Sequence, residues 1–153
     1  MKKYIILIII ALATTQVGCR TDIDKEIVET KEPNTSSIQV SSEDKEIIDR
    51  SENLSDFVVE LFGVDDAATI IFNDTALVTV VMAYDKELTE DTKELINDLV
   101  MEKDAGINQV LISQDEKTFF EVIEVISELM NGSPYDNHVD QISKMIEKSN
   151  KKN

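Results

Sequence analysis

The sequence predicts an α+β domain in which helices pack against a small three-stranded sheet, in the order α-β-β-α-β-α. Three observations lead to this fold class. Two runs rich in β-branched residues flank a two-residue turn, amphipathic helical stripes follow in alternation with a third strand, and Gly and Pro number only 4 and 2 in 153 residues. Apolar residues make up 42% of the chain, which is enough for the core of one domain.

The first helix is expected to end just before Gly63, where a left-handed C-cap is needed. Its inner stripe has the i, i+3, i+4, i+7 spacing of a helix and consists of Leu54, Phe57, Val58 and Leu61. Ile47 and Ile48 continue this stripe backwards. The folded part therefore begins either near Glu43 or near Asn53.

Two strands follow at 67–72 and 75–84, and Asn73-Asp74 between them is a hairpin signal. The second strand has apolar residues at both its even-numbered and its odd-numbered positions, so both of its faces are apolar. This predicts a strand inside the sheet or in an interface. If helices cover only one face, an apolar strip is left exposed as a candidate partner surface, formed by the odd-numbered neighbours or by Val78, Val80, Met82 and Tyr84. The alternative is that the C-terminal helix covers this strip.

The next helix begins at the N-cap Thr89 and ends at 104–106. Its inner face is expected to consist of Leu95, Ile96, Leu99 and Val100. A short third strand at 110–112 follows. The link between the second and third strands is long enough for a crossover that places them parallel.

Ser113 and Glu116 match a capping box for the following helix. The side chains expected to point inward from it are Phe119, Val122, Ile123, Ile126, Leu129 and Met130. Residues 131–134, with the sequence NGSP, stop this helix. A last helix is expected from about Asn137 to Lys148, before a basic end.

The N-terminus has the pattern of an export signal. Lys2 and Lys3 precede an apolar run at 4–12, which is too short for a membrane span of about 20 residues but suits the h-region of a signal peptide. Small residues and Gly18-Cys19 follow, and this arrangement resembles a bacterial lipoprotein signal. The resemblance implies cleavage before Cys19 and a thioether-linked diacylglycerol on its sulfur. Gln16 departs from the pattern, since an aliphatic residue is usual there, and whether it weakens processing stays open.

Two alternatives to a lipoprotein remain: a secreted protein cut at an Ala-x-Ala-like site, and a signal anchor with an incidental thiol. The single cysteine favours the lipoprotein, because an exported protein with one thiol has no intramolecular disulfide partner. The two acyl chains of a diacylglycerol would anchor the protein stably in the membrane, because each buried CH₂ contributes about 0.8 kcal/mol of binding free energy. The expected organisation is a signal peptide at 1–18, an acylated cysteine with an acidic flexible tether at 19–52, an αββαβα domain at 53–133, and a C-terminal helix with a basic tail at 134–153.

The charge of the chain excludes nucleic acid as a partner. Its 31 Asp and Glu outnumber 15 Lys and Arg, giving a formal net charge of -16. Such a surface repels phosphate backbones and anionic lipid alike. Attachment to a membrane therefore needs the diacylglycerol anchor.

No catalytic, cofactor or metal motif is apparent in the sequence. His138 is the only histidine, and we expect it to be an exposed polar residue with Asp136 and Asp140 as its nearest candidate partners. The serines have no histidine partner within a predicted folded element. The carboxylate pairs at 65–66 and 90–91 are expected to serve a turn and a helix start, and weak nonspecific cation binding by the acidic surface stays open.

Several ordered motifs resemble the YhcN/YlaJ sporulation lipoproteins of spore-forming Firmicutes. The segments that carry the resemblance are LFGVDDAATIIFNDTALVTVVM and ELTEDTKELINDLVMEKDAGINQVLISQDEKTFFEVIEVISELMNGSP. Within them, Gly63-Val64 and Ala67 match the end of a helix, residues 70–80 match a hairpin, and a strand leading into a helix is matched by Val110, Ile112-Ser113, Asp115, Gly132 and Pro134. The chain departs from the family at Leu77-Val78-Thr79 and in a less basic C-terminal helix.

This resemblance implies a non-enzymatic, lipid-anchored protein on the extracytoplasmic face of the cell or spore membrane. It would act in spore formation or germination by holding a protein partner or a homo-oligomer. The segments FNDTALVTVVMAYDKELTED and INDLVMEK also resemble the ring-building module of stage III sporulation protein AH. A lipoprotein that captures a solute or a peptidoglycan fragment is the second hypothesis, and an enzyme has the least support.

Overall fold

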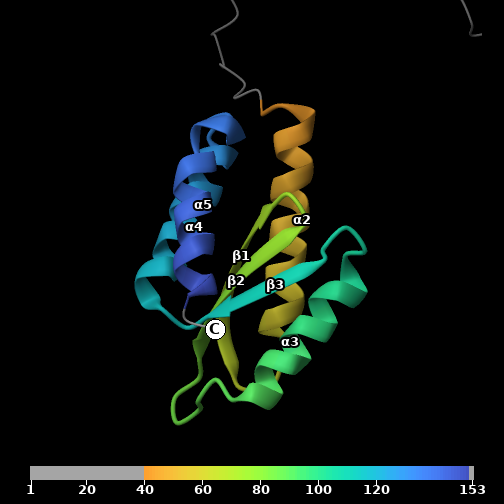
Figure 1. Cartoon of the computed structure of the whole chain (residues 1–153), viewed down its shortest axis with the longest axis vertical. Helices are drawn as coiled ribbons and strands as arrows, with labels where there is room; N and C mark the ends of the chain where they lie inside the picture. Colours follow the sequence, from red (N-terminus) through yellow and green to blue (C-terminus); the bar gives the residue numbers. More distant parts are fainter. Residues whose placement is uncertain (1–39, 152–153) are drawn as a thin grey trace, which may run out of the picture. The chain divides into compact units, whose positions relative to one another are not determined.

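The computed structural model describes residues 40–151, and its elements follow the predicted order (Figure 1). The helices are α2 (Ser42–Val59), α3 (Glu90–Lys103), α4 (Glu116–Met130) and α5 (Val139–Asn150), with the 3₁₀ turn η1 (Tyr135–Asn137) before α5. The strands β1 (Val64–Phe72), β2 (Thr75–Met82) and β3 (Gln109–Ser113) form one sheet in the order β1-β2-β3. The α+β class is confirmed.

β1 and β2 form the predicted antiparallel hairpin, in which Phe72 pairs with Thr75 across the turn. Asn73 has a φ of 56°, in the left-handed region that asparagine tolerates better than most residues. The register shifts between Val64 and Asp66, so the start of β1 is irregular. Such bulges often mark the exposed edge of a sheet.

β3 lies parallel to β2, as expected from the crossover through α3. The hairpin turn fixes where β3 begins, because the Asp74 carbonyl accepts hydrogen bonds from the amides of Asn108 (2.8 Å) and Gln109 (3.2 Å). The Asn108 side chain also donates to the Asp74 carboxylate at 3.2 Å.

Helices cover both faces of the sheet, which explains why both the even-numbered and the odd-numbered residues of β2 are apolar. On one face, Val78 and Val80 of β2 pack in a cluster that includes Leu54 and Val58 of α2 and Ile96 and Val100 of α3. On the other face, Leu77 packs in a cluster with Val122 and Leu129 of α4 and with Ile142 and Met145 of α5. Each fully buried aliphatic side chain stabilises the fold by roughly 1.5–3 kcal/mol. Figure 1 shows α2 and α3 on one side and α4 and α5 on the other.

The folded domain begins earlier than Asn53, where the tether was expected to end. α2 starts at Ser42, whose preceding residue Ser41 accepts a hydrogen bond from the Asp44 amide at its side chain. Ile48 is 5% exposed and belongs to the core cluster on the α4 side. The backward extension of the stripe through Ile48 is therefore correct, and α2 contributes to both cores.

The sequence predicted the N-caps of α3 and α4. The N-cap of α3 is where it was expected, and the N-cap of α4 lies two residues later than expected. The Thr89 side chain accepts from the Thr92 amide, as expected of an N-cap. For α4 the N-cap is Asp115 and not Ser113, since the Asp115 side chain accepts from the Thr118 amide. The Ser113 hydroxyl instead accepts from the Asp115 amide at 3.1 Å.

The inner faces of α3 and α4 are narrower than the periodicity predicted. Leu95 is 52% exposed, Ile123 is 42% exposed and Met130 is 51% exposed, although all three were expected to point inward. Val125, which was not predicted, is fully buried. The stripe on α4 is thus rotated toward Val125, and Ile123 and Met130 are left at the surface.

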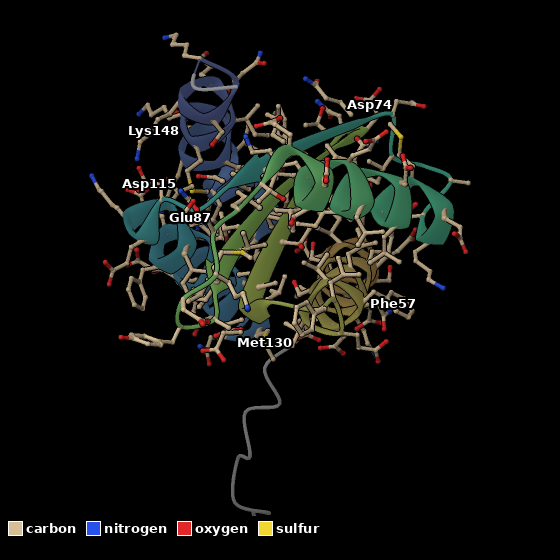
Figure 2. All side chains as sticks on the ribbon, turned by 90° about the horizontal axis from the view of Figure 1, so that it is seen from below. Phe57, Asp74, Glu87, Asp115, Met130 and Lys148 are labelled. Atoms are coloured by element: carbon tan, nitrogen blue, oxygen red, sulfur yellow. The ribbon has the colours of Figure 1, made fainter. Side chains whose placement is uncertain are left out.

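Lys148 near the end of α5 holds that helix against the start of α4. Its ammonium lies 3.4 Å from the Asp115 carboxylate and 3.2 Å from the Thr118 hydroxyl. Figure 2 shows Asp115 and Lys148 on these adjacent helix ends. The expected last helix is confirmed, with bounds shifted to Val139–Asn150.

Candidate functional site

The predicted apolar strip on β2 is not exposed along its length. Val78 is fully buried and Val80 is 2% exposed, because α2 and α3 cover the face to which they point. Met82 is half-buried against the same cluster. The covering elements are therefore α2 and α3 and not the C-terminal helix. Of these four residues only Tyr84, at 98% exposure, is open to a partner. Among the odd-numbered neighbours, Leu77 is fully buried and Val81 is 36% exposed.

Tyr84 has a neighbour that the sequence analysis missed, Phe62, which is 90% exposed. The Gly63 carbonyl accepts from the Ala83 amide at 3.0 Å, so the segments that carry the two rings lie side by side. Gly63 has a φ of 93°, which lets the chain turn sharply after Phe62. We call Phe62 and Tyr84 the aromatic end of the domain.

One cation lies near the aromatic end. The Lys86 ammonium lies 5.5 Å from the centroid of the Phe62 ring, which is within cation–π range. By helical spacing Phe62 would continue the buried stripe, since it lies four residues after Val58. It is exposed because α2 ends at Val59, before the chain reaches Phe62. No local pattern in the sequence identifies it as a surface residue.

His138 is not the exposed polar residue that the sequence predicted. It is 5% exposed, and its ring nitrogens contact two side chains from the C-terminal part of α4 and the residues after it. Nε2 lies 2.8 Å from the Ser133 hydroxyl, and Nδ1 lies 3.4 Å from the Glu128 carboxylate. The expected neighbours Asp136 and Asp140 are not these partners, and a serine does have a histidine partner.

The Glu128, His138 and Ser133 arrangement resembles a relay for nucleophilic catalysis, but the amides of Gly132 and Ser133 are already bonded within the turn. A serine nucleophile needs an open substrate position and nearby amides to bind an oxyanion. The Ser133 amide donates to the Glu128 carbonyl and the Gly132 amide to the Leu129 carbonyl. Four cavities of about 410–630 Å³ lie among residues 40–151, and neither Ser133 nor His138 lines any of these four. The arrangement fits a clamp that fixes the turn between α4 and α5.

A groove of about 480 Å³ runs along the outer edge of β1, and we call it the β1-edge groove. Its floor is the strand segment 67–69, one wall is the acidic side of α2 with Glu52 and Asp56, and the other wall comes from α4. The α4 wall includes Ile123 and Met130, which the sequence placed in the core. Figure 2 shows Met130 at the margin of the domain between α2 and α4.

The groove could not be predicted from local patterns, because its three parts are far apart in the sequence. The signal that comes nearest is the surplus of apolar residues on α4, where more positions are apolar than one buried stripe requires.

The acidic pair at 90–91 lies in the first turn of α3, as expected, and Glu90 Oε1 lies 2.8 Å from the Lys93 ammonium. The pair at 65–66 lies within β1 and not in a turn, and there Asp66 Oδ1 accepts from the Ala67 amide at 2.8 Å. Within 40–151, no three His, Cys, Asp or Glu side chains gather in a way that could hold a metal ion.

The lipidation candidate Cys19 and its neighbour Gln16 lie outside the described residues. The predicted tether lies outside them up to residue 39. No helix within 40–151 has both the length and the apolar character that a bilayer span requires.

The comparison with protein families agrees with the resemblance found in the sequence. The family model described as "Sporulation lipoprotein YhcN/YlaJ" matches residues 14–149. The match covers residues 40–149 of the described domain and also residues 14–39, including Cys19. A search of curated proteins finds none that matches the sequence. The likeness to the ring-building module stays a prediction.

Proposed function

The chain belongs to the YhcN/YlaJ sporulation lipoprotein family, and from this premise we propose that it is a lipid-anchored, non-enzymatic interaction or scaffold module. It acts in spore formation or germination at the spore membrane or cortex. Its anchor is a diacylglycerol on Cys19, and the domain stands on the extracytoplasmic face. The tether gives the domain a reach of tens of Å from the membrane, at about 5–6 Å times the square root of its residue number.

The observation that carries the interaction role is the aromatic end. Phe62 and Tyr84 are 90% and 98% exposed on adjoining segments, while Phe120 is 58% exposed and the remaining aromatic side chains of the described domain are buried or half-buried. Aromatic residues are enriched in the buried centres of protein interfaces, where a few such side chains supply most of the binding free energy. Two rings held in water at one end of the domain fit a surface that a partner covers.

A double variant, Phe62→Ser with Tyr84→Ser, tests this role. Both side chains are exposed, so we expect the domain to remain folded and membrane-bound while spore formation or germination falls toward the level of the deletion strain. The matched control is Leu95→Ser with Met101→Ser, which removes two exposed apolar side chains from α3. A double variant at the aromatic end that sporulates and germinates like wild type would contradict the interaction role.

The non-enzymatic part of the proposal has its own test at Ser133. A fluorophosphonate labels serine nucleophiles that a histidine activates. We expect no labelling of Ser133, because its hydroxyl serves the clamp with His138. Labelling that is lost in Ser133→Ala would make the clamp an active site and overturn this part of the proposal.

A further inference from the structure

We propose that the β1-edge groove binds an extended segment of a partner protein, in which aliphatic and basic side chains alternate. This inference deepens the proposed function and rests on it, since it takes the chain to be an interaction module and names the chemistry of one partner. It concerns a surface separate from the aromatic end.

The first argument comes from the backbone of β1. Phe72 and Thr75 flank a two-residue hairpin turn and pair across it, so in the ladder the even-numbered residues of β1 bond to β2. The amides and carbonyls of Ala67, Thr69 and Ile71 therefore point away from β2. β1 has no other neighbour in the sheet of the described domain.

Of the backbone groups that point away from β2, only the first and the last have a hydrogen-bond partner in the described domain. The Ala67 amide donates to the Asp66 carboxylate at 2.8 Å, and the Ile71 carbonyl accepts from the Tyr135 hydroxyl at 2.7 Å. A side chain of the same strand and one from η1 thus close the two outermost positions.

Four groups between these ends have no hydrogen-bond partner among residues 40–151. They are the Ala67 carbonyl, the Thr69 amide and carbonyl, and the Ile71 amide. Thr69 is 1% exposed, and its hydroxyl is likewise without a partner in this part of the chain. An unpaired polar group that is already buried costs about 1–3 kcal/mol. A ligand that supplies the missing partners therefore gains more here than on a solvated edge.

Three of the four groups fit an incoming strand parallel to β1. One residue of that strand would donate to the Ala67 carbonyl and accept from the Thr69 amide. The residue two positions later would donate to the Thr69 carbonyl. The Ile71 amide lies past the floor of the groove, which ends at Thr69, so the bound strand is not expected to reach it. This pairing does not need the Ala67 amide or the Ile71 carbonyl, which Asp66 and Tyr135 already bind.

The two walls determine the side chains of the incoming strand. Successive side chains of a strand point to opposite faces of the sheet. One set would meet the carboxylates of Glu52 and Asp56 on α2, and the other set would meet Ile123, Ile126 and Met130 on α4. No Lys or Arg lines the groove within the described residues. Charge complementarity therefore calls for Lys or Arg on the α2 side and aliphatic residues on the α4 side.

The test uses the full chain in detergent and short fluorescent peptides, measured by anisotropy. We expect a peptide with the repeat Val-Lys to bind, and a Val-Glu peptide not to bind. A block peptide of the same Val and Lys composition separates a strand-like site from nonspecific attraction to an acidic protein. Equal binding of the block and alternating peptides would overturn the inference.

Substitutions on the two walls locate the site. Glu52→Gln with Asp56→Asn should weaken binding by about threefold to tenfold, as expected for two exposed ion pairs. Glu46→Gln with Asp49→Asn is the matched control on the same helix, outside the groove. On the other wall, Ile123→Lys should abolish binding, while Phe120→Lys, at a 58% exposed position of α4 outside the groove, should not.

Backbone pairing is tested without changing the protein. N-methylation of alternate residues blocks one edge of a strand, so a peptide methylated at one parity should lose binding while the peptide methylated at the other parity keeps it. The amide resonance of Thr69 should move downfield on binding. Equal affinity of the two methylated peptides, or an unchanged Thr69 resonance, would contradict pairing with β1. Because these measurements depend on neither the anchor nor the aromatic end, their failure leaves the proposed function standing.

Discussion

At the scale of single residues, the contact between Arg50 and Asp104 joins α2 to the end of α3. Arg50 Nε donates to Asp104 Oδ2 at 2.8 Å, and the Gly106 amide donates to Oδ1 at 2.9 Å. The hydrogen bond from Arg50 is the main cause that lowers the pKa of Asp104, helped by the Gly106 amide and the Arg50 charge against the opposing effect of burial.

Because this pKa is lowered on folding, Asp104 contributes stability above its unfolded pKa near 3.8, and the contribution is lost as the pH falls through the folded value. We expect Asp104→Asn to reduce the free energy of unfolding by about 1 kcal/mol at pH 7 and to have little effect at about pH 2. Urea unfolding at both pH values measures this, with the exposed Glu102→Gln as control. An equal loss at both pH values would show that the carboxylate charge is not responsible.

Tyr135 gives the opposite pH dependence. Burial raises the pKa of Tyr135 from 10.0 to about 12. Its stability contribution is therefore complete below pH 10 and is lost as the pH rises from 10 to 12. We expect Tyr135→Phe to lose about 0.5–1.5 kcal/mol at pH 7 and to unfold with a shallower alkaline dependence than wild type. Tyr84→Phe is the control, since its ring is exposed. Identical alkaline profiles for Tyr135→Phe and wild type would refute the assignment.

At the scale of the elements, the clamp around His138 positions α5. His138 precedes the first residue of α5, and its carbonyl accepts from the Ile142 amide at 2.9 Å. We expect His138→Ala to lower the free energy of unfolding by about 1–3 kcal/mol, since it leaves the Ser133 hydroxyl without its partner. His138→Gln, which can still reach Ser133, should recover part of the loss. Thermal unfolding of these variants measures the effect, and no change in His138→Ala would show that α5 is held by its apolar face alone.

The order of the elements was predictable because each has its own local signal. α2 stops at Val59 with Glu60 as its C-cap, earlier than the position just before Gly63 that was predicted. The hairpin is encoded by Asn73-Asp74 between β-branched runs, and the cap of α3 by Thr89. These features depend on residues close together in the sequence. A single pass along the chain is enough to find them.

What the sequence missed depends on contacts between distant elements. Periodicity identifies a helical stripe but not its rotation against the sheet, so Ile123 and Met130 were placed in the core and Val125 was not. The apolar strip on β2 could not be assigned to solvent or core without knowing that α2 and α3 share one face of the sheet. His138 was misplaced for the same reason, because its burial depends on how α4 and α5 meet.

At the scale of the whole molecule, the proposed anchor and tether carry an acidic domain with two candidate contact surfaces. The aromatic end and the β1-edge groove differ in chemistry, since one presents rings to water and the other presents unpaired backbone between an acidic and an apolar wall. With a formal net charge of -16, the chain favours basic partners, and the proposed acyl anchor would be needed to hold it at an anionic membrane.

The central claim is that Cys19 holds a sporulation protein at the membrane. Its most direct test follows the membrane partition of the mature protein through sporulation, for wild type and Cys19→Ala. We predict that wild type appears with sporulation and sediments with the membrane, whereas Cys19→Ala, once processed to mature size, is released into the soluble fraction. Retention of processed Cys19→Ala at the membrane, or constant expression in vegetative cells, would contradict the account.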